Sequence, residues 1–354
     1  MTRNRRPVAV THLCCGDKRL NALLPRIRAF MSQDVSEITV MGSRVRGYHS
    51  PDGPSLWLRD HTDMMRGARY WEEDMTSMVD YFAETQTGKG WLFDYVTMVP
   101  DKLPSERENW AKHVRVPVEA DVEYRFCNGV FLAWQATGND SWMKRMLPHC
   151  ERALAYILTD PWRWDVKRKL VKRAYTIDTW DFDYTAGKHD WLNFQITEDT
   201  FWGIMHGDSS GYYQAFLQMA TMYDHLRLRP RAAYWRRFAA AFRTRANKVS
   251  FNGRFYTHHV HLVPVTIEGV DESAQLSLSN PMDINRGLAT HAMAVSIIEE
   301  YRHRAETTGA FAPWFSIDPP FPDGIYGDDK IVKGAYCNGG IMPLVGGELA
   351  RAAF

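Results

Sequence analysis

The sequence predicts a mainly helical domain in which helical hairpins follow one another to form an α/α toroid. Helical periodicity of apolar residues is found near 18–31, 62–86, 119–137, 141–159, 210–227, 230–248 and 284–303, and another helix is expected to begin near 340. Loops of unequal length separate these segments. No low-complexity segment or obvious interdomain linker interrupts them, so we expect one domain over residues 1–354.

Two pairs of these helices are expected to form hairpins. The first pair meets at Thr137-Gly-Asn-Asp140, where Gly138 would end one helix and Asp140 would cap the next. The second pair runs from Asp208 through a turn at 228–230 to Lys248. Strand signals are short, at 38–41 and 253–262, and predict small sheets at the ends of helices.

The composition excludes several classes of partner. The chain has 43 basic and 42 acidic residues, so its net charge of +1 gives no electrostatic reason to expect nucleic acid or an anionic membrane. The five cysteines show no C-x-x-C spacing, which argues against a disulfide framework or zinc ribbon and favours a reducing, cytoplasmic setting. We find no signal peptide and no membrane span. The composition does not indicate an oligomeric state.

The segment Ser55 to Asp63 combines three side chains that suit a sugar ring at the start of a predicted helix. Trp57 offers an aromatic plate, Arg59 a fork of donors and Asp60 a carboxylate acceptor. The alternative is structural: Asp60 would cap the helix, with the arginine at the surface and the tryptophan in the core.

A second cluster places three carboxylates among aromatic residues, between Tyr175 and Tyr184. Asp178, Asp181 and Asp183 lie there around Trp180. Aromatic surroundings desolvate a carboxyl and raise its pKa, as a general acid requires. The alternatives are a set of turn-forming aspartates or a cation-binding loop, although the D-x-x-D-x-D spacing is wrong for an EF-hand.

Histidines occur at two further places. At another expected helix start, Asp208 or Ser209 would cap the helix, and His206 and Asp208 are candidates for binding a ligand, which is compatible with capping. His258, His259 and His261 form an H-H-x-H run, but a metal would need a third ligand that the sequence does not indicate. We therefore predict no metal and no cofactor.

The last informative segment runs from Gly334 to Ala350. Asn338 precedes two glycines that allow a close approach of backbone to a ligand, and Pro343 suits the first turn of a helix. Glu348 follows inside that helix. It is a candidate second catalytic carboxylate, with an exposed helical glutamate as the alternative.

Taken in order, these segments resemble the six-hairpin glycosidases, the (α/α)6-toroid superfamily that includes glucoamylases, neutral invertases and processing α-glucosidases. Trp57-Leu-Arg-Asp60 is similar to the glucoamylase W-x-R-D, whose Arg and Asp hold the sugar. Asp178-Thr-Trp-Asp181 is similar to its D-L-W-E, which implies that Asp181 is the general acid. Ala136-Thr-Gly138, Ile204-Met-His-Gly207 and Asn338-Gly-Gly340 resemble segments of neutral invertases. The resemblance covers roughly 300 residues and matches no single family closely.

The resemblance implies hydrolysis of a glycosidic bond in a small or oligomeric saccharide, by an inverting mechanism with an acid and a base. We expect Asp181, Asp178 and Glu348 to be catalytic, and the substrate-binding residues to be Trp57, Arg59, Asp60, Trp180, Asp183, His206, Asp208 and Asn338. The toroid of the superfamily needs more helices than this chain predicts, so we expect it to be incomplete at the C-terminus. Two alternatives remain: an epimerase or lyase using His206 with Tyr212 or Tyr213, and a sugar-binding remnant without turnover.

Overall fold

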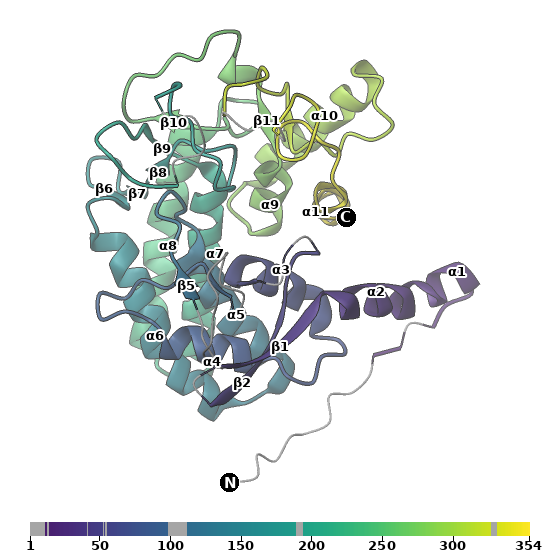
Figure 1. The fold of residues 1–354 in the computed structure, drawn as a ribbon, viewed down its shortest axis with the longest axis vertical. Coiled ribbons are helices and arrows are strands. Elements are labelled where there is room, and N and C mark those ends of the chain that lie inside the picture. The colour runs from purple at the N-terminus through teal and green to yellow at the C-terminus, as the bar shows by residue number, and fades with distance from the viewer. Residues whose placement is uncertain are drawn as a thin grey trace, which may run out of the picture. The chain divides into compact units, whose positions relative to one another are not determined.

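The computed structural model describes residues 11–12, 14–40, 42–51, 53, 55–97, 112–188, 194–326 and 331–354. The chain divides into two compact units, which we treat separately. Unit 1 consists of Met1–Arg115 and Val122–Tyr156, and unit 2 of Val116–Asp121 and Ile157–Phe354. Helices dominate both units and the strands are short (Figure 1), so the predicted mainly helical class is confirmed.

Unit 1 begins with two short helices and a β-hairpin. Its elements are α1 (Lys18–Asn21), α2 (Leu23–Met31), η1 (Ser32–Asp34), β1 (Val35–Val40), β2 (Ser43–Tyr48), β3 (Leu56–Trp57), α3 (Leu58–Ala68), α4 (Ser77–Glu84), β4 (Tyr95–Thr97), β5 (Lys112–Val114), α5 (Val122–Thr137) and most of α6 (Asp140–Thr159). Strands β1 and β2 pair antiparallel, and β3, β4 and β5 form a three-stranded sheet in that order. The expected strand at 38–41 is the end of β1, and its last residue, Met41, lies outside the described residues.

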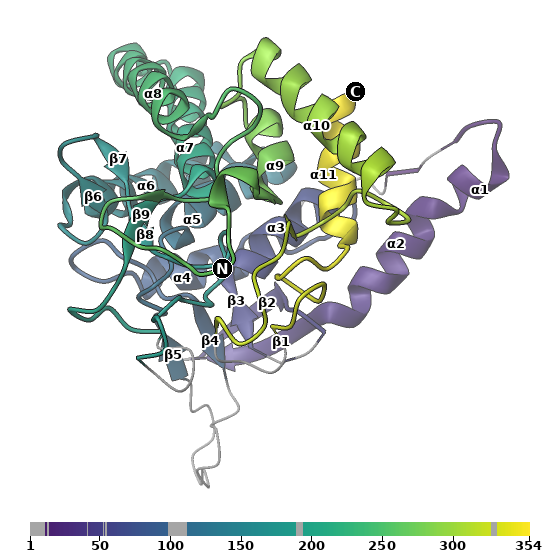
Figure 2. The ribbon, with the colours of Figure 1, turned by 90° about the horizontal axis from the view of Figure 1, so that it is seen from above.

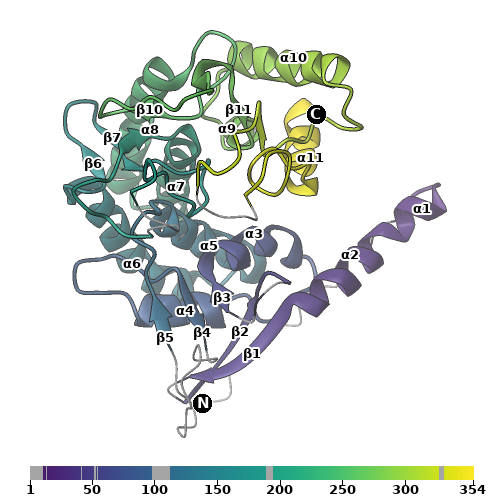
Figure 3. The same cartoon turned by 45° about the horizontal axis from the view of Figure 1, so that its top comes forward.

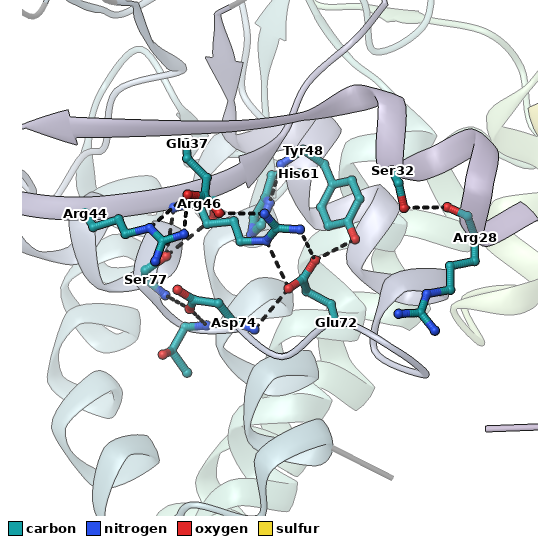
Figure 4. Close-up of polar contacts among 11 residues, drawn as sticks. Arg28, Ser32, Glu37, Arg44, Arg46, Tyr48, His61, Glu72, Asp74 and Ser77 are labelled. Carbon is teal, nitrogen blue, oxygen red and sulfur yellow. Dashed lines mark hydrogen bonds and ion pairs between the residues drawn. The ribbon is translucent and has the colours of Figure 1, made fainter. Parts of the chain in front are cut away.

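The single helix expected over 62–86 is wrong, because α3 ends at Ala68 and α4 begins at Ser77. The connecting segment carries Glu72, whose buried carboxylate accepts two bonds from the Arg46 guanidinium, at 3.1 and 3.2 Å, and one from the Tyr48 hydroxyl at 2.9 Å (Figure 4). A long-range ion pair therefore takes the place of the helix that the local pattern predicts.

Helix α3 packs on α5 in unit 1, at a place where a small residue is needed. A Cβ added to Gly129 of α5 would lie 3.0 Å from Cγ2 of Thr62. Behind α3, the apolar residues Tyr48, Ala68 and Trp71 form a small buried cluster, onto which Leu24 and other half-buried side chains pack. These contacts fix the start of α3, which carries the first of the candidate segments.

The turn between α5 and α6 confirms one predicted cap and corrects the other. Gly138 adopts a φ of +60° and its N–H donates to the Trp134 carbonyl at 2.8 Å, so it ends α5 as expected. Asp140 is not the cap of α6. Asn139 fills that place, because its Oδ1 accepts the backbone N–H of Trp142 at 3.0 Å, while Asp140 is the first helical residue and accepts from the Trp134 indole.

Unit 2 holds the second predicted hairpin and several short sheets. Its elements are β6 (Trp164–Asp165), β7 (Leu170–Val171), β8 (Arg173–Ala174), β9 (Trp202–Ile204), α7 (His206–His225), α8 (Arg229–Ser250), β10 (Val260–His261), η2 (Glu272–Ala274), β11 (Leu276–Ser277), α9 (Ser279–Asn285), α10 (His291–Thr307), β12 (Ile317–Asp318) and α11 (Pro343–Ala353). Helices α7 and α8 lie side by side as the predicted hairpin (Figure 2). Helix α9 packs against α7 and α11, with α10 beside it (Figure 3).

Two boundaries in unit 2 differ from the sequence predictions. The helix expected over 284–303 is split into α9 and α10. Gly287 adopts a φ of +80° after α9, and the Thr290 hydroxyl caps α10 by accepting the N–H of Met293. The strand expected over 253–262 is reduced to β10, which pairs with β9 in a three-stranded sheet completed by β8. Among the described residues, no helix has the length and apolar character needed to cross a bilayer.

Candidate functional site

The loop that follows β8 in unit 2 carries three of the predicted carboxylates, and Asp178 anchors it. Asp178 is fully buried and adopts a φ of +44°. Its Oδ1 accepts the Thr179 N–H at 2.7 Å and the Ser279 hydroxyl at 2.5 Å, and its Oδ2 accepts the Ser279 N–H at 3.2 Å. The side chain therefore joins the loop to the first residue of α9.

The surroundings of Asp178 keep its carboxyl ionised. Burial would raise its pKa, but the positive charge of His206 and hydrogen bonds from Ser277 and Ser279 outweigh that effect, and the pKa is lowered. A carboxylate held in its anionic form has no proton to donate to a substrate, so Asp178 is not suited to act as an acid. Its bonds position the loop, and a catalytic role for Asp178 stays a prediction.

His206, the first residue of α7, is also fully buried. Its Nδ1 lies 2.5 Å from Oδ2 of Asp283 and its Nε2 lies 2.9 Å from the Ser277 hydroxyl. Burial would lower the pKa of the ring, but the Asp283 carboxylate and the nearby charge of Asp178 reverse this, so the pKa is raised. Both ring nitrogens of His206 are thus bonded inside the protein, and its role in substrate binding stays a prediction.

Asp208, two residues after His206 in α7, forms a buried ion pair with Arg173. Its Oδ2 lies 3.3 Å from a guanidinium nitrogen of Arg173, and both side chains are almost completely inaccessible. Arg173 also donates to the carbonyl of Trp180 at 2.7 Å. The ion pair joins β8 to α7 and, through Arg173, bonds the loop that carries Asp181. Asp208, like Asp178, therefore stabilises this loop by a buried contact.

Asp183 and Asn338 are likewise turned into the protein. Asp183 is 5% exposed and accepts the N–H of Phe194 at 3.1 Å. The amide of Asn338 accepts the Phe321 N–H at 2.7 Å and donates to the carbonyls of Phe321 and Ile331. Both side chains bond backbone groups, and their predicted role in substrate binding stays a prediction.

Asp181 differs from its neighbours because it is only half-buried and is flanked by aromatic residues. The Trp180 indole N–H donates to the Tyr336 hydroxyl at 3.2 Å, and the rings of Phe182 and Tyr336 pack edge to face with centroids 5.9 Å apart. Tyr336 itself is 48% exposed. Asp181 therefore lies on a fixed loop between Trp180 and Phe182. Both of these side chains contact the exposed Tyr336.

Glu348 is the second predicted catalytic carboxylate, and it lies in α11 with 4% exposure rather than on a solvated helix face. The side-chain amide of Asn285 donates to its Oε2 at 2.6 Å and to its carbonyl at 2.8 Å. The next residue, Arg286, donates to the carbonyl of Gly207 and the hydroxyl of Ser210, each at 3.0 Å. The end of α9 thus ties α11 and the start of α7 together.

In unit 1, Trp57, Arg59 and Asp60 surround the start of α3. Trp57 is the residue that precedes the helix, so Asp60 lies in the first turn and is not the cap. The Trp57 indole packs against the ring of Tyr95 on the paired strand, with centroids 4.2 Å apart. All three predicted residues are half-buried, and the helix-cap alternative does not apply to Asp60.

The sequence reasoning missed the residues that organise unit 2. Arg173, Ser277, Ser279, Asp283 and Asn285 make most of the bonds described above, and four of the five lie between 277 and 285. The run Ser-Asn-Pro-Met-Asp-Ile-Asn-Arg from 279 to 286 places five polar residues in eight ahead of Gly287. This high proportion of polar residues could have indicated that the segment makes specific buried bonds, because a buried helix normally has few polar residues.

No group of three or more His, Cys, Asp or Glu side chains in the described part of the chain is arranged to hold a metal ion. His258 instead accepts the backbone N–H of Asp178 at 2.8 Å, through its Nε2. Burial lowers the pKa of His258 to about 4, so this ring is neutral and suited to accept. His261 bonds the Glu272 carboxylate at 2.5 Å.

The mainly helical fold of this chain is similar to that of several solved glycosidase structures. A GH63 mannosylglycerate hydrolase from Thermus thermophilus, solved with Tris, is similar to this chain with a TM-score of 0.61 and 11% identity, over 93% of this chain and 86% of that one. The same enzyme in complex with glucose gives a TM-score of 0.60 and 13% identity. A rhamnosidase from Klebsiella oxytoca with rhamnose bound gives 0.51 and 13%, and the match covers 85% of this chain and 50% of that one. Comparisons with protein-family models and with curated proteins found no match.

Proposed function

We propose that this protein is a glycoside hydrolase that cleaves a glycosidic bond of a small or oligomeric saccharide by inversion. The similar structures are glycosidases, and two of them were solved with glucose or rhamnose bound. In the proposed reaction Asp181 protonates the leaving oxygen, and Glu348 activates the water that attacks the anomeric carbon.

The observation that carries the proposal is that α9 is bonded both to the loop that carries Asp181 and to Glu348. At its first residue Ser279 bonds Asp178, three residues before Asp181, and at its last residue Asn285 bonds Glu348. A direct-displacement mechanism needs an acid and a base at a fixed separation, with room for a water. A short helix bonded to the loop of Asp181 and to Glu348 supports a fixed separation of this kind.

The epimerase or lyase alternative receives no support from the geometry. It requires His206 and a tyrosine to exchange protons with a substrate, yet both ring nitrogens of His206 bond other residues. The Tyr212 hydroxyl bonds the carbonyl of Ala120 and its side chain is fully buried. Tyr213 is 8% exposed.

Acid catalysis by Asp181 is tested with substrates that differ in leaving group. The Asp181→Asn variant should lose about 10²–10⁴-fold in kcat on a disaccharide or alkyl glycoside that the wild type cleaves. It should lose far less on the matching glycosyl fluoride, because fluoride leaves without protonation. Asp224→Asn, at an exposed aspartate paired with Arg236, is the matched control. Equal losses on both substrates would contradict the assignment.

Base catalysis by Glu348 predicts a different pattern. Glu348→Gln should lose activity on the fluoride and the disaccharide alike, since both need the activated water. The exposed Glu306 of α10 provides the control substitution, Glu306→Gln. NMR of the first product formed should show the anomer opposite to that of the substrate. A product of retained configuration, or full activity in Glu348→Gln, would exclude the mechanism.

We further propose that unit 1 carries a sugar-binding element of its own, made of Trp57, Arg59 and Asp60. An indole face stacks on a pyranose, the guanidinium donates hydrogen bonds to hydroxyl oxygens, and the carboxylate accepts hydrogen bonds from hydroxyl groups. Calorimetry should show weaker monosaccharide binding in Asp60→Asn and Trp57→Ala than in the wild type. Binding without turnover on any glycoside would instead favour a non-catalytic sugar-binding protein. Because all five cysteines are free, we place the protein in the cytoplasm.

A further inference from the structure

Helices α1 and α2 of unit 1 carry a line of large apolar side chains on an exposed face. These two helices form the helix expected over 18–31, and the residue that joins them also lies in the right-handed helical region (Figure 3). The exposed fractions are 50% for Leu20, 46% for Leu23, 39% for Ile27 and 64% for Phe30. Single exposed apolar residues need no explanation, but four on one helix face mark an interaction surface, which we call the apolar stripe.

The spacing of the apolar stripe is that of a coiled-coil seam. Its four residues follow one another at intervals of three, four and three positions, which places two of them at a and two at d of a heptad. At about 100° per residue they fall within a sector about 80° wide. A narrow a/d stripe is the surface that a second helix covers, whereas a helix that lies on a membrane buries a broader apolar face.

The two edges of the apolar stripe differ in character. On one edge the e positions hold Leu24 and Met31, which are half-buried and pack on the small apolar cluster behind α3. On the other edge the g positions hold Arg19 and Arg26, which are both exposed. The rest of unit 1 therefore covers one edge of the stripe, and a row of two guanidinium groups follows the other.

The charge along the second edge indicates the kind of helix that fits. Residues 17–31 contain four basic side chains and one acidic side chain, Asp17, which forms an ion pair with Arg19. A second copy of α2 is disfavoured in both orientations. Antiparallel pairing would set the two arginine rows against each other, and parallel pairing would use the e positions that unit 1 already covers. A helix with acidic residues beside its apolar seam would instead place carboxylates opposite Arg19 and Arg26.

We propose that the apolar stripe of α1 and α2 is the docking surface for an acidic amphipathic helix of a partner protein. The partner helix contributes apolar residues at its own a and d positions, which pack into the stripe, and carboxylates that face Arg19 and Arg26. This docking is independent of the proposed hydrolase activity, because it uses none of the residues assigned to that reaction.

Two synthetic peptides of about three heptads test the proposal. Both carry Leu at a and d and Ala at the outer positions, and they differ only in having Glu or Lys at e and g. The like charges of each peptide keep it from pairing with itself. Titration followed by fluorescence anisotropy should show saturable binding of the Glu peptide to the wild type, and binding of the Lys peptide should be about tenfold weaker or less.

Substitutions at exposed positions locate the binding surface. Ile27→Ser should weaken binding of the Glu peptide by about 10–100-fold, because the burial of this apolar side chain is lost. Arg19→Glu combined with Arg26→Glu should reverse the preference, so that the Lys peptide binds more tightly than the Glu peptide. This gain of binding cannot arise from unfolding. Val295→Ser and Arg302→Glu, at exposed positions of α10, are the matched controls and should bind as the wild type does.

Four outcomes would overturn the proposal. Equal binding of the two peptides would show that the arginine row does not select the partner, and the absence of binding would show that the stripe does not receive such a helix. A wild-type dimer in sedimentation velocity that Ile27→Ser disrupts would assign the stripe to a second copy. Binding to phosphatidylcholine vesicles that contain phosphatidylserine, lost in Ile27→Ser, would assign it to a membrane surface.

Discussion

Two fully buried histidines, one in each unit, have opposite pKa shifts. His61 in unit 1 accepts the Tyr48 N–H at its Nδ1, 3.1 Å away, and burial lowers its pKa to about 4. His206 in unit 2 contacts Asp283 directly and its pKa is raised. The carboxylate with the larger effect on the pKa of His61, Glu72, is already bonded by Arg46 (Figure 4). Burial makes a histidine neutral unless it is the principal partner of an anion.

The same contrast applies to the ion pairs of the two units. Arg46 is 31% exposed and bonds both Glu37 and Glu72, so it keeps water and a second anion if one partner is lost. Arg173 is inaccessible and has one carboxylate partner, Asp208, among the contacts described. A guanidinium cannot shed its charge in a protein. The stability of unit 2 therefore depends more strongly on a single carboxylate.

The largest expected effect is a loss of stability when the carboxylate of each ion pair is replaced by its amide, in two separate variants. Asp208→Asn should lower the free energy of unfolding by about 3–5 kcal/mol, because it leaves the buried charge of Arg173 uncompensated. Glu72→Gln should cost about 1–2 kcal/mol, since Arg46 retains Glu37 and solvent. Urea unfolding followed by tryptophan fluorescence measures both. Equal losses would show that burial of the arginine does not control the outcome.

The histidines should give opposite pH dependences of stability. The folded pKa of His61 is depressed, so the unfolded chain gains a proton first and stability falls by about 3 kcal/mol as pH drops from 6.5 towards 4. The folded pKa of His206 is raised, so its stabilisation is complete below 6.5 and is lost as pH rises through the folded value. Asp178, with a lowered pKa, contributes stability that disappears only below 3.8.

Thermal unfolding across this pH range separates the two histidines. His61→Asn keeps an acceptor for the Tyr48 N–H and should reduce the loss of stability on the acid side. His206→Gln should remove the loss on the alkaline side and leave the acid side unchanged. If His61→Asn lost as much stability at acid pH as the wild type, the acid sensitivity would have to come from other titratable groups.

The smallest effects concern two glycines of helices in the two units. Gly207→Ala should cost about 1–3 kcal/mol, because its Cβ would meet the Cβ of Ser279 at 2.8 Å as well as the hydroxyl. Gly67→Ala in α3 should stabilise by about 0.5–1 kcal/mol, since the nearest atom to the new Cβ is 3.7 Å away and alanine favours the helix. A stabilised Gly207→Ala would mean that the start of α7 is not closely fitted to α9.

The sequence predicted the helical class because periodicity is a local property, and the turn at Gly138 because a positive φ has a local signature. It placed Asp178, His206 and Asp208 in the correct segments but could not tell that they turn inward. Their orientation depends on Ser279, Asp283 and Arg173, which are 35 to 101 residues away in the chain. The break within 62–86 has the same origin, in the bonds that Arg46 and Tyr48 make to Glu72.

The fixed length of helix α9 restricts where residues can be inserted into this chain or deleted from it. Its seven residues span about 10 Å at 1.5 Å per residue, and the bonds at Ser279 and Asn285 use both ends. One inserted residue would turn the far end by about 100° and carry Asn285 away from Glu348. Insertions and deletions within α9 should therefore not be tolerated, because they would separate the bonds at its two ends.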